Sequence, residues 1–288
     1  MNGAALIDPP ALSQADFRKI SDLAYRRFGL NLPPGKEGLV AARLGKKIRQ
    51  GGFATFAEYH RHVLADRTGE TLVGLIDALT TNFTSFLRES AHFDLLTQAA
   101  TTEFRDASSF RVWSAACSSG EEPYSIVMSL LNAAQTAPCR WAGDLRVLAT
   151  DISTKVLEKA RAGIYEASRF EGVPEHWRRG FLLKGLGRYQ GSFKIKPSVA
   201  AHVDFMRLNL IEPLPPGTFQ FVFCRNVMIY FDKPTQQDMV RRLADHIEPG
   251  GYFFVGHSET LNGIDHPLRY VRPAVYRKEK RIVSGRRG

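Results

Sequence analysis

Two adjacent acids, Glu121 and Glu122, follow a turn of small residues and are well placed to do chemistry. The turn, residues 117–120, separates a short apolar run from a helical pattern that begins at Pro123. Any α/β protein contains strand–turn–helix units, and in a doubly wound sheet the ligand binds at the first such turn. Carboxylates there would repel a pyrophosphate, which binds at a bare, positive helix N-terminus. The pattern favours S-adenosylmethionine, with its ammonium and sulfonium groups, over a dinucleotide.

A third acid, Asp151, ends the apolar run 145–150, which we expect to be the second strand. An acid at this position is the usual partner of a ribose diol. It lies further from Gly120 than the roughly 20 residues typical of dinucleotide sites. An insertion at 134–144 accounts for the extra length. Together with the first turn, Asp151 indicates a nucleoside-containing cofactor.

A later strand is predicted at 219–224, because the run FQFVFC is apolar on both faces, as a central strand is. Its end carries Arg225 and Asn226, and Tyr230 follows one turn later. Carboxyl ends of parallel strands lie at one edge of a sheet, so we expect these side chains near the acids.

The remaining elements are read from apolar periodicity. The region before residue 80 shows only helical patterns, and the mixed stretch 81–89 is expected to be a linker. The predicted helices are 13–28, 36–49, 55–65, 68–79, 91–104 and 235–247, and the predicted further strands are 252–256 and 270–277. Two short alternating runs, 192–196 and 199–205, are interpreted as an antiparallel hairpin inserted in the α/β part.

Composition narrows the class of protein. The chain has 288 residues and a net charge of +10, which points to an acidic partner: nucleic acid, anionic membrane or an acidic protein surface. No apolar run approaches the roughly 18 residues of a membrane span, and the first residues lack a signal-peptide pattern. We therefore expect a cytoplasmic protein. Three cysteines without CxxC spacing and eight histidines without an HExxH motif predict no metal.

Four basic residues of the predicted helix 36–49, namely Lys36, Arg43, Lys46 and Lys47, fall on a face beside its apolar stripe. A solvated face is the ordinary explanation of such a cluster. A docking surface for an acidic partner is the alternative.

Several longer stretches resemble the CheR family of chemotaxis receptor methyltransferases, which transfer a methyl group from S-adenosylmethionine to protein glutamates. They are TTNFTSFLRE, VWSAACSSGEEPYS, DISTKVLEKARAGIY, FCRNVMIYFD and GHSE, in family order. The resemblance implies a Rossmann-like methyltransferase fold with an N-terminal all-helical domain and an inserted small antiparallel β-subdomain. It places a substrate-recognition domain at 1–80, a linker contributing to the active site at 81–92, and the catalytic domain at 93–288, with the β-subdomain at about 185–205.

The resemblance also assigns site residues. Glu122 resembles the acid that meets the methionine amino group, and Asp151 the ribose-binding acid. The cofactor-binding set that it implies is Asn82, Thr84, Arg88, Glu122, Asp151, Asn209, Leu210, Arg225 and Asn226. Arg88 and Tyr230 resemble the active-site pair, although without the resemblance they would be taken as a surface charge and a core aromatic. The four basic residues of helix 36–49 match the substrate-reading helix of the family. No metal is implied, and the product is S-adenosylhomocysteine.

The implied substrates are glutamate carboxylates on the cytoplasmic coiled-coil domains of chemotaxis receptors, and some relatives bind a receptor C-terminal peptide at the β-subdomain. Methylation of these glutamates serves sensory adaptation. A nucleic-acid methyltransferase is the first alternative, because of the net charge and because Cys224 could be imagined as a nucleophile. The sequence CRNV after the strand lacks the proline run of adenine-N6 enzymes, so we expect no nucleic-acid partner. A non-catalytic cofactor-sensing module is the second alternative.

Overall fold

The computed structural model describes residues 11–280 and divides into two compact units. One unit holds the chain up to Asn82 together with Tyr230–Asp232, and the other holds Phe83–Ile229 and the chain from Lys233 onward. The prediction that the chain does not begin with a signal peptide concerns residues that lie largely outside the described range. No helix within that range is both long and apolar enough to cross a membrane.

The helical unit forms as its apolar stripes predict. Its helices in the described range are α1 (Gln14–Phe28), α2 (Glu37–Gln50), α3 (Phe56–Ala65) and α4 (Glu70–Leu79). Ser13 and Thr55 cap α1 and α3 by accepting backbone N–H groups, as N-cap hydroxyls do. Residues Val40, Leu44 and Ile48 are fully buried on one side of α2, which packs on α4. All four helices were predicted, and α4 starts two residues later than expected.

A distant segment completes this unit, and the sequence did not indicate it. Residues Tyr230–Asp232 pair with the end of α1: the Asn31 amide donates to the Tyr230 carbonyl at 2.8 Å, and Leu30 forms an antiparallel bridge with Phe231. The Tyr25 hydroxyl donates to Asp232 at 2.9 Å. The chain therefore leaves the α/β unit after its fourth parallel strand and returns three residues later.

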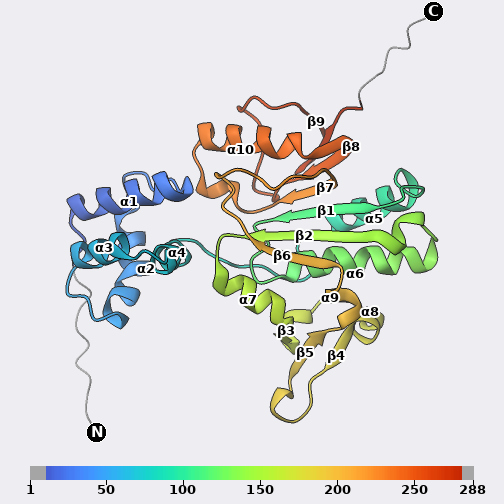
Figure 1. Cartoon of the computed structure of the whole chain (residues 1–288), viewed down its shortest axis with the longest axis horizontal. Coiled ribbons are helices and arrows are strands. Elements are labelled where there is room, and N and C mark those ends of the chain that lie inside the picture. Colours follow the sequence, from blue (N-terminus) through green and yellow to red (C-terminus); the bar gives the residue numbers. More distant parts are fainter. Residues whose placement is uncertain (1–10, 281–288) are drawn as a thin grey trace, which may run out of the picture. The chain divides into compact units, whose positions relative to one another are not determined.

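The α/β unit is built on a sheet whose strand order, within the described residues, is β6-β2-β1-β7-β8-β10-β9 (Figure 1). The first five of these strands are parallel, and a terminal antiparallel hairpin of β10 and β9 closes the sheet. Their bounds are β1 (Phe110–Ala115), β2 (Leu145–Asp151), β6 (Val203–Arg207), β7 (Phe219–Cys224), β8 (Ile247–Phe254), β9 (Leu268–Arg272) and β10 (Val275–Lys278). The predicted single strand 270–277 is therefore two strands joined by a turn.

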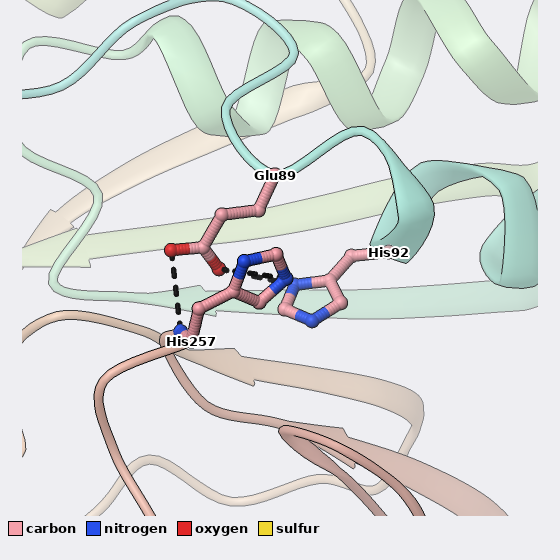
Figure 2. A group of neighbouring side chains, drawn as sticks. All are labelled: Glu89, His92 and His257. Atoms are coloured by element: carbon pink, nitrogen blue, oxygen red, sulfur yellow. Dashed lines mark hydrogen bonds and ion pairs between the residues drawn. The ribbon is translucent and has the colours of Figure 1, made fainter.

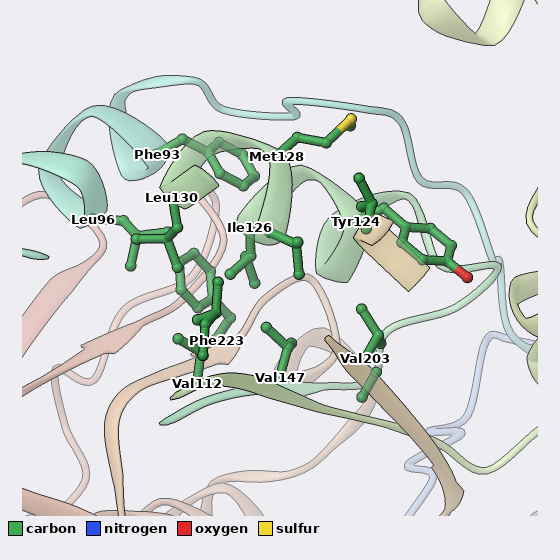
Figure 3. Close-up of a cluster of buried hydrophobic side chains, with 14 of the residues drawn as sticks. Phe93, Leu96, Val112, Tyr124, Ile126, Met128, Leu130, Val147, Val203 and Phe223 are labelled. Carbon is green, nitrogen blue, oxygen red and sulfur yellow. The ribbon is translucent and has the colours of Figure 1, made fainter. Parts of the chain in front are cut away.

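Helices α5 (Ala91–Thr102) and α6 (Glu121–Thr136) cover one face of this sheet. Figure 3 shows Phe93 and Leu96 of α5 and Ile126 of α6 meeting Val112 and Phe223 from the strands. Further helices are α7 (Thr154–Ala162), α8 (Glu175–Phe181), α9 (Pro197–Ala200) and α10 (Lys233–Asp245), with 3-10 turns η1 (Arg140–Asp144), η2 (Ala167–Phe170), η3 (Gly187–Tyr189) and η4 (Met228–Tyr230). The packing of α6 on the strands fixes where the first βα turn lies.

The expected antiparallel β-subdomain is present, but its strands differ from the prediction. Strand β5 (Ser192–Ile195) pairs with β3 (Ile164–Glu166) and β4 (Leu182–Lys184), in the order β3-β5-β4. The predicted hairpin partner, 199–205, instead forms α9 and then β6, which pairs in parallel with β2. Both runs alternate over a few residues, so their pairing was decided by tertiary packing.

Candidate active site of a methyltransferase

The site forms where strand order reverses, because β1 lies between β2 and β7 and the three carboxyl ends share one edge. The turn after β1 is tightly specified. Its Ala116 and Ser118 have positive φ, of 67° and 50°, and Gly120 has φ of 96°. A Cβ on Gly120 would lie 2.8 Å from both Ala160 Cβ and the Tyr165 hydroxyl. Backbone strain of this kind gathers at functional sites.

The two adjacent acids have different surroundings. Glu121 is fully buried, accepts the Ser119 hydroxyl at 2.7 Å and forms an ion pair with Arg169. Arg169 also donates to the Thr84 carbonyl at 2.6 Å. The charge of Glu121 is therefore compensated inside the protein. Our expectation that both acids attract a cationic ligand is corrected for Glu121, because Arg169 lies far away in sequence and gave no local signal.

Glu122 belongs to a buried group of three charges. It accepts the Ser114 hydroxyl at 2.6 Å and Arg225 Nη1 at 2.9 Å, while Arg225 Nη2 lies 2.9 Å from Glu89. The Arg225 side chain is 2% exposed and each carboxylate 12%. Two carboxylates and one guanidinium leave a net charge of −1. A buried negative charge is costly, so this trio, Glu89–Arg225–Glu122, fits a cationic ligand.

Asp151 lies at the end of β2, as predicted. Its Oδ2 accepts the Ser118 amide at 2.8 Å and its Oδ1 accepts the Ser153 amide at 3.0 Å. Ser153 in turn caps α7 through Val156. The carboxylate thus joins the turns after β1 and β2.

Asn209 and Leu210 follow β6 at the same edge of the sheet and are both buried. The Leu208 amide donates to the Asp151 carbonyl at 2.9 Å, and Arg242 donates to the Leu210 carbonyl at 2.7 Å. Asn209 donates to Glu212 at 3.1 Å. The structure therefore brings both residues beside Asp151, where the adenosine part of a nucleoside cofactor is expected.

The loop after β7 is held by Glu259, which the sequence reasoning did not single out. Its carboxylate accepts the amides of Asn226 at 2.7 Å, Met228 at 2.8 Å and Gly256 at 2.6 Å. Burial raises the pKa of Glu259, and these N–H donors oppose that shift by stabilising the charged form. Asn226 itself has φ of 59°. The motif GHSE, in which Glu259 lies, was the available signal.

The linker residues divide between the units. Asn82 belongs to the helical unit, whereas Thr84 and Arg88 belong to the α/β unit. The Leu87 amide donates to Ser125 of α6 at 3.0 Å, and Arg225 donates to the Arg88 carbonyl. Arg88 Nη1 donates to the Phe83 carbonyl at 2.9 Å. Residues 83–90 are therefore folded against the start of α6.

Tyr230 belongs to the helical unit, where its hydroxyl accepts the Thr81 amide at 2.9 Å and donates to the Thr81 carbonyl at 3.2 Å. Arg88 and Tyr230 are thus in different units, and their joint role stays a prediction. The hydroxyl therefore fixes the first residue of the linker.

The four basic residues predicted on this helix are not equivalent, and Lys36 lies just before α2 begins. Lys36 and Lys46 are exposed, whereas Arg43 and Lys47 are half-buried. Arg43 donates to the Leu79 carbonyl and, at 2.8 Å, to the Thr81 hydroxyl. Lys47 Nζ approaches Gly74 so closely that a Cβ there would lie 2.4 Å away. Only the first two offer fully exposed charge.

The thiols do not form a reactive centre. Cys117 and Cys224 are buried, and burial, followed by the charge of Asp151 and of Glu259 respectively, raises both thiol pKa values well above the usual range. A raised pKa removes the thiolate that a nucleophile needs. Cys224 is therefore a core residue, which argues against the pyrimidine-methylating alternative.

Fold and site together define an S-adenosylmethionine-dependent methyltransferase: a sheet of this order, a net-negative trio that fits an ammonium, and an acid, Asp151, at the strand end where a ribose is expected. A family model described as CheR methyltransferase, SAM binding domain, matches residues 82–276, and one described as CheR methyltransferase, all-alpha domain, matches residues 15–80. The chain belongs to the CheR methyltransferase family.

Curated relatives match along nearly the whole chain. The chemotaxis protein methyltransferase of Escherichia coli K12 is 40% identical, over 94% of this chain and 93% of its own length. Chemotaxis protein methyltransferase 2 of Pseudomonas aeruginosa is 38% identical, over 92% and 93%. The chemotaxis protein methyltransferase of Borreliella burgdorferi is 35% identical, over 93% and 95%. The predicted fold class and cofactor are confirmed.

Proposed function

We propose that this chain methylates glutamate side chains of chemotaxis receptors, forming γ-methyl esters in the cytoplasm. The observation that carries this proposal is that both family models, the helical and the cofactor-binding one, match in order along the chain. Relatives named chemotaxis protein methyltransferase support it. Sensory adaptation is the process that such esters serve.

Methyl transfer to a carboxylate needs no general base from the protein. S-adenosylmethionine supplies a methyl group on a positively charged sulfur. A glutamate carboxyl has a pKa near 4.3 and is already an anion at neutral pH, so it needs no general base. This agrees with the buried, protonated thiols. The protein's contribution is alignment of the carboxylate and exclusion of water between opposite charges that cancel on reaction.

Named residues would take these tasks. Glu122 would hold the cofactor's amino group, Asp151 its ribose, and Asn209 with Leu210 its adenine. The family's linker pattern adds Asn82 and Thr84 to the cofactor site. After β7, Asn226 and Arg225 would line the methionine end. Arg88 carries five N–H donors, and its Nη1 donates to the Phe83 carbonyl. The other N–H groups of Arg88 would bind the incoming carboxylate. Tyr230 would orient that carboxylate through its hydroxyl.

Two surfaces would meet the receptor. Exposed Lys36 and Lys46 on α2 suit an acidic, glutamate-rich coiled coil. The β-subdomain offers the outer edge of β4 and three exposed apolar side chains, Leu183, Leu186 and Tyr189, of which Leu186 is 81% exposed. An open strand edge beside apolar side chains is suited to binding an extended peptide, here a receptor C-terminus. No nucleic acid is proposed as a partner.

Transfer of labelled methyl groups tests the proposal. The protein is incubated with labelled S-adenosylmethionine and a panel of receptor cytoplasmic domains, and the products are treated with base. Glutamate esters release volatile methanol. Receptor domains in which the methylation-region glutamates are replaced by glutamine serve as matched controls and should stay unlabelled. Base-stable label, or label on added DNA or RNA in place of receptor, would refute the proposal.

A further inference from the structure

Glu89, the last residue of the stretch TTNFTSFLRE, was assigned no role, yet it lies at the centre of a polar network (Figure 2). Its Oε2 contacts Arg225 Nη2 at 2.9 Å, His92 Nδ1 at 3.6 Å and His257 Nε2 at 3.8 Å, and its Oε1 accepts the His257 amide at 3.2 Å. Glu89 also has φ of 59°, a conformation that costs free energy for a non-glycine residue. The strained backbone at Glu89 places its carboxylate against Arg225.

A carboxylate and two imidazoles suggest a cation site, but their surroundings argue otherwise. The same Oε2 atom forms an ion pair with the guanidinium of Arg225, which already places a positive charge beside this carboxylate. Burial, and then the charge of Arg225, lowers the pKa of His92 to about 3, so His92 is neutral at pH 7. The cluster therefore works as one ion pair, Glu89–Arg225, packed against the neutral ring of His92.

The ion pair controls how Arg225 can meet Glu122. Arg225 donates from Nη1 to Glu122 and from Nη2 to the Arg88 carbonyl, and Nη2 also forms the ion pair with Glu89 at 2.9 Å. A guanidinium that was free of Glu89 could bind Glu122 through two parallel hydrogen bonds, the preferred arrangement of such a pair. Without Glu89, Arg225 and Glu122 would form a neutral pair. The ion pair with Glu89 and the hydrogen bond to the Arg88 carbonyl engage Nη2 away from Glu122, and the charge of Glu89 gives the trio its net charge of −1.

We propose that Glu89 is a positioning residue for cofactor binding: it holds Arg225 so that Glu122 stays oriented and negatively charged toward the cofactor's amino group. The proposal rests on the assignment of Glu122 to that amino group. It predicts that changes at Glu89 weaken binding of the amino-acid end of the cofactor and leave binding of the adenosine end unchanged.

Two ligands distinguish binding of the cofactor's amino-acid end from binding of its adenosine end. S-adenosylhomocysteine carries the amino-acid part, whereas 5′-methylthioadenosine keeps the adenosine and lacks it. Calorimetry should show that Glu89→Gln weakens S-adenosylhomocysteine binding about tenfold, or about 1.4 kcal/mol, and leaves methylthioadenosine binding unchanged. KM for S-adenosylmethionine should rise by a similar factor while kcat changes little. Glu89→Asp, which keeps the charge, should recover part of the affinity.

Two controls make the result specific. Glu103→Gln removes the partner of Arg277 in the same unit and should leave both affinities unchanged. In a Glu122→Gln background, Glu89→Gln should have little further effect, because the two residues act through one another. Equal losses for both ligands, or an unchanged affinity for S-adenosylhomocysteine, would overturn the proposal. Wild-type protein that binds cofactor but does not methylate receptors would refute the proposed function and leave this inference standing.

Discussion

Charge compensation, more than sequence position, decides what each acid at this site does. Glu121 and Glu122 are adjacent, but successive helical side chains point about 100° apart, so one faces Arg169 and the other Arg225. Arg169 neutralises Glu121 fully. Arg225 divides its charge between Glu122 and Glu89, and only that side of the helix keeps a net negative charge. Among these acids, a cationic ligand is therefore drawn to Glu122.

Asp151 gives a direct test of the nucleoside end. Asp151→Asn keeps an acceptor for the Ser118 amide but loses the charge and one acceptor for the ribose hydroxyls. We expect cofactor affinity to fall by about 1–3 kcal/mol, the usual cost of an unpaired buried polar group. Calorimetry with S-adenosylhomocysteine measures it, and circular dichroism checks that the variant is folded. An affinity equal to wild type would contradict the ribose assignment.

His92 makes stability depend on pH. Its pKa is about 3 in the folded state against an ordinary value of 6.5, so between these values only the unfolded chain takes up the proton. Stability is therefore complete above pH 6.5 and falls as the pH drops, by at most about 1.4 kcal/mol per pH unit.

The variant His92→Gln isolates this contribution. From pH 7 to pH 5, denaturant unfolding should show wild type losing about 2 kcal/mol more than the variant, since one proton is involved over 1.5 pH units. Parallel pH profiles for the two proteins would show that His92 is not buried in its neutral form.

At the scale of elements, apolar patterns predicted most of the fold because each pattern has one buried arrangement. The stripe Val40, Leu44 and Ile48 could only be a helix face, and the fully apolar run 219–224 only a central strand. The short run 192–195 had no such constraint. Its partners, β3 and β4, are three residues long and were not visible as strands. Site residues at strand ends could be predicted because the strands themselves could. Glu89, Arg169 and Glu259 could not, because their partners lie far away in the sequence.

The edge of β4 carries an element-scale prediction. Leu186→Asp should abolish binding of peptides copied from receptor C-termini, because it puts a charge on the most exposed apolar side chain of the β-subdomain. Methylation of receptors truncated before that peptide should be unchanged. Exposed Leu64 on α3, 60% exposed, provides a matched control as Leu64→Asp. Equal peptide affinity for wild type and the Leu186 variant would remove this surface from the proposal.

At the scale of the whole molecule, the chain joins a cofactor-binding unit to a helical unit that such chemistry does not require. The helical unit is tied to the other one twice along the chain, through the linker and through Tyr230–Asp232. Lys46 of α2 and Lys36 just before it are exposed, whereas Arg43 donates a hydrogen bond to Thr81 of the linker. A net charge of +10 agrees with an acidic macromolecular partner. A basic helical unit in addition to the cofactor-binding one supports our proposal that the helical unit helps to select the substrate.

Charge reversal on α2 should therefore slow receptor methylation without touching cofactor binding. Each exposed ion pair is worth only about 0.2–1 kcal/mol, but two reversals also weaken the long-range attraction that guides encounter, which salt screens within about 10 Å at 0.1 M. We expect Lys36→Glu with Lys46→Glu to lower kcat/KM for receptor several-fold at low salt, with the difference fading as salt rises. Lys155→Glu with Lys159→Glu, on exposed positions of α7, changes the net charge equally and controls for overall charge. If both double variants lose the same activity, total charge is what matters. If the α2 variant matches wild type across the salt series, its lysines only solvate the helix.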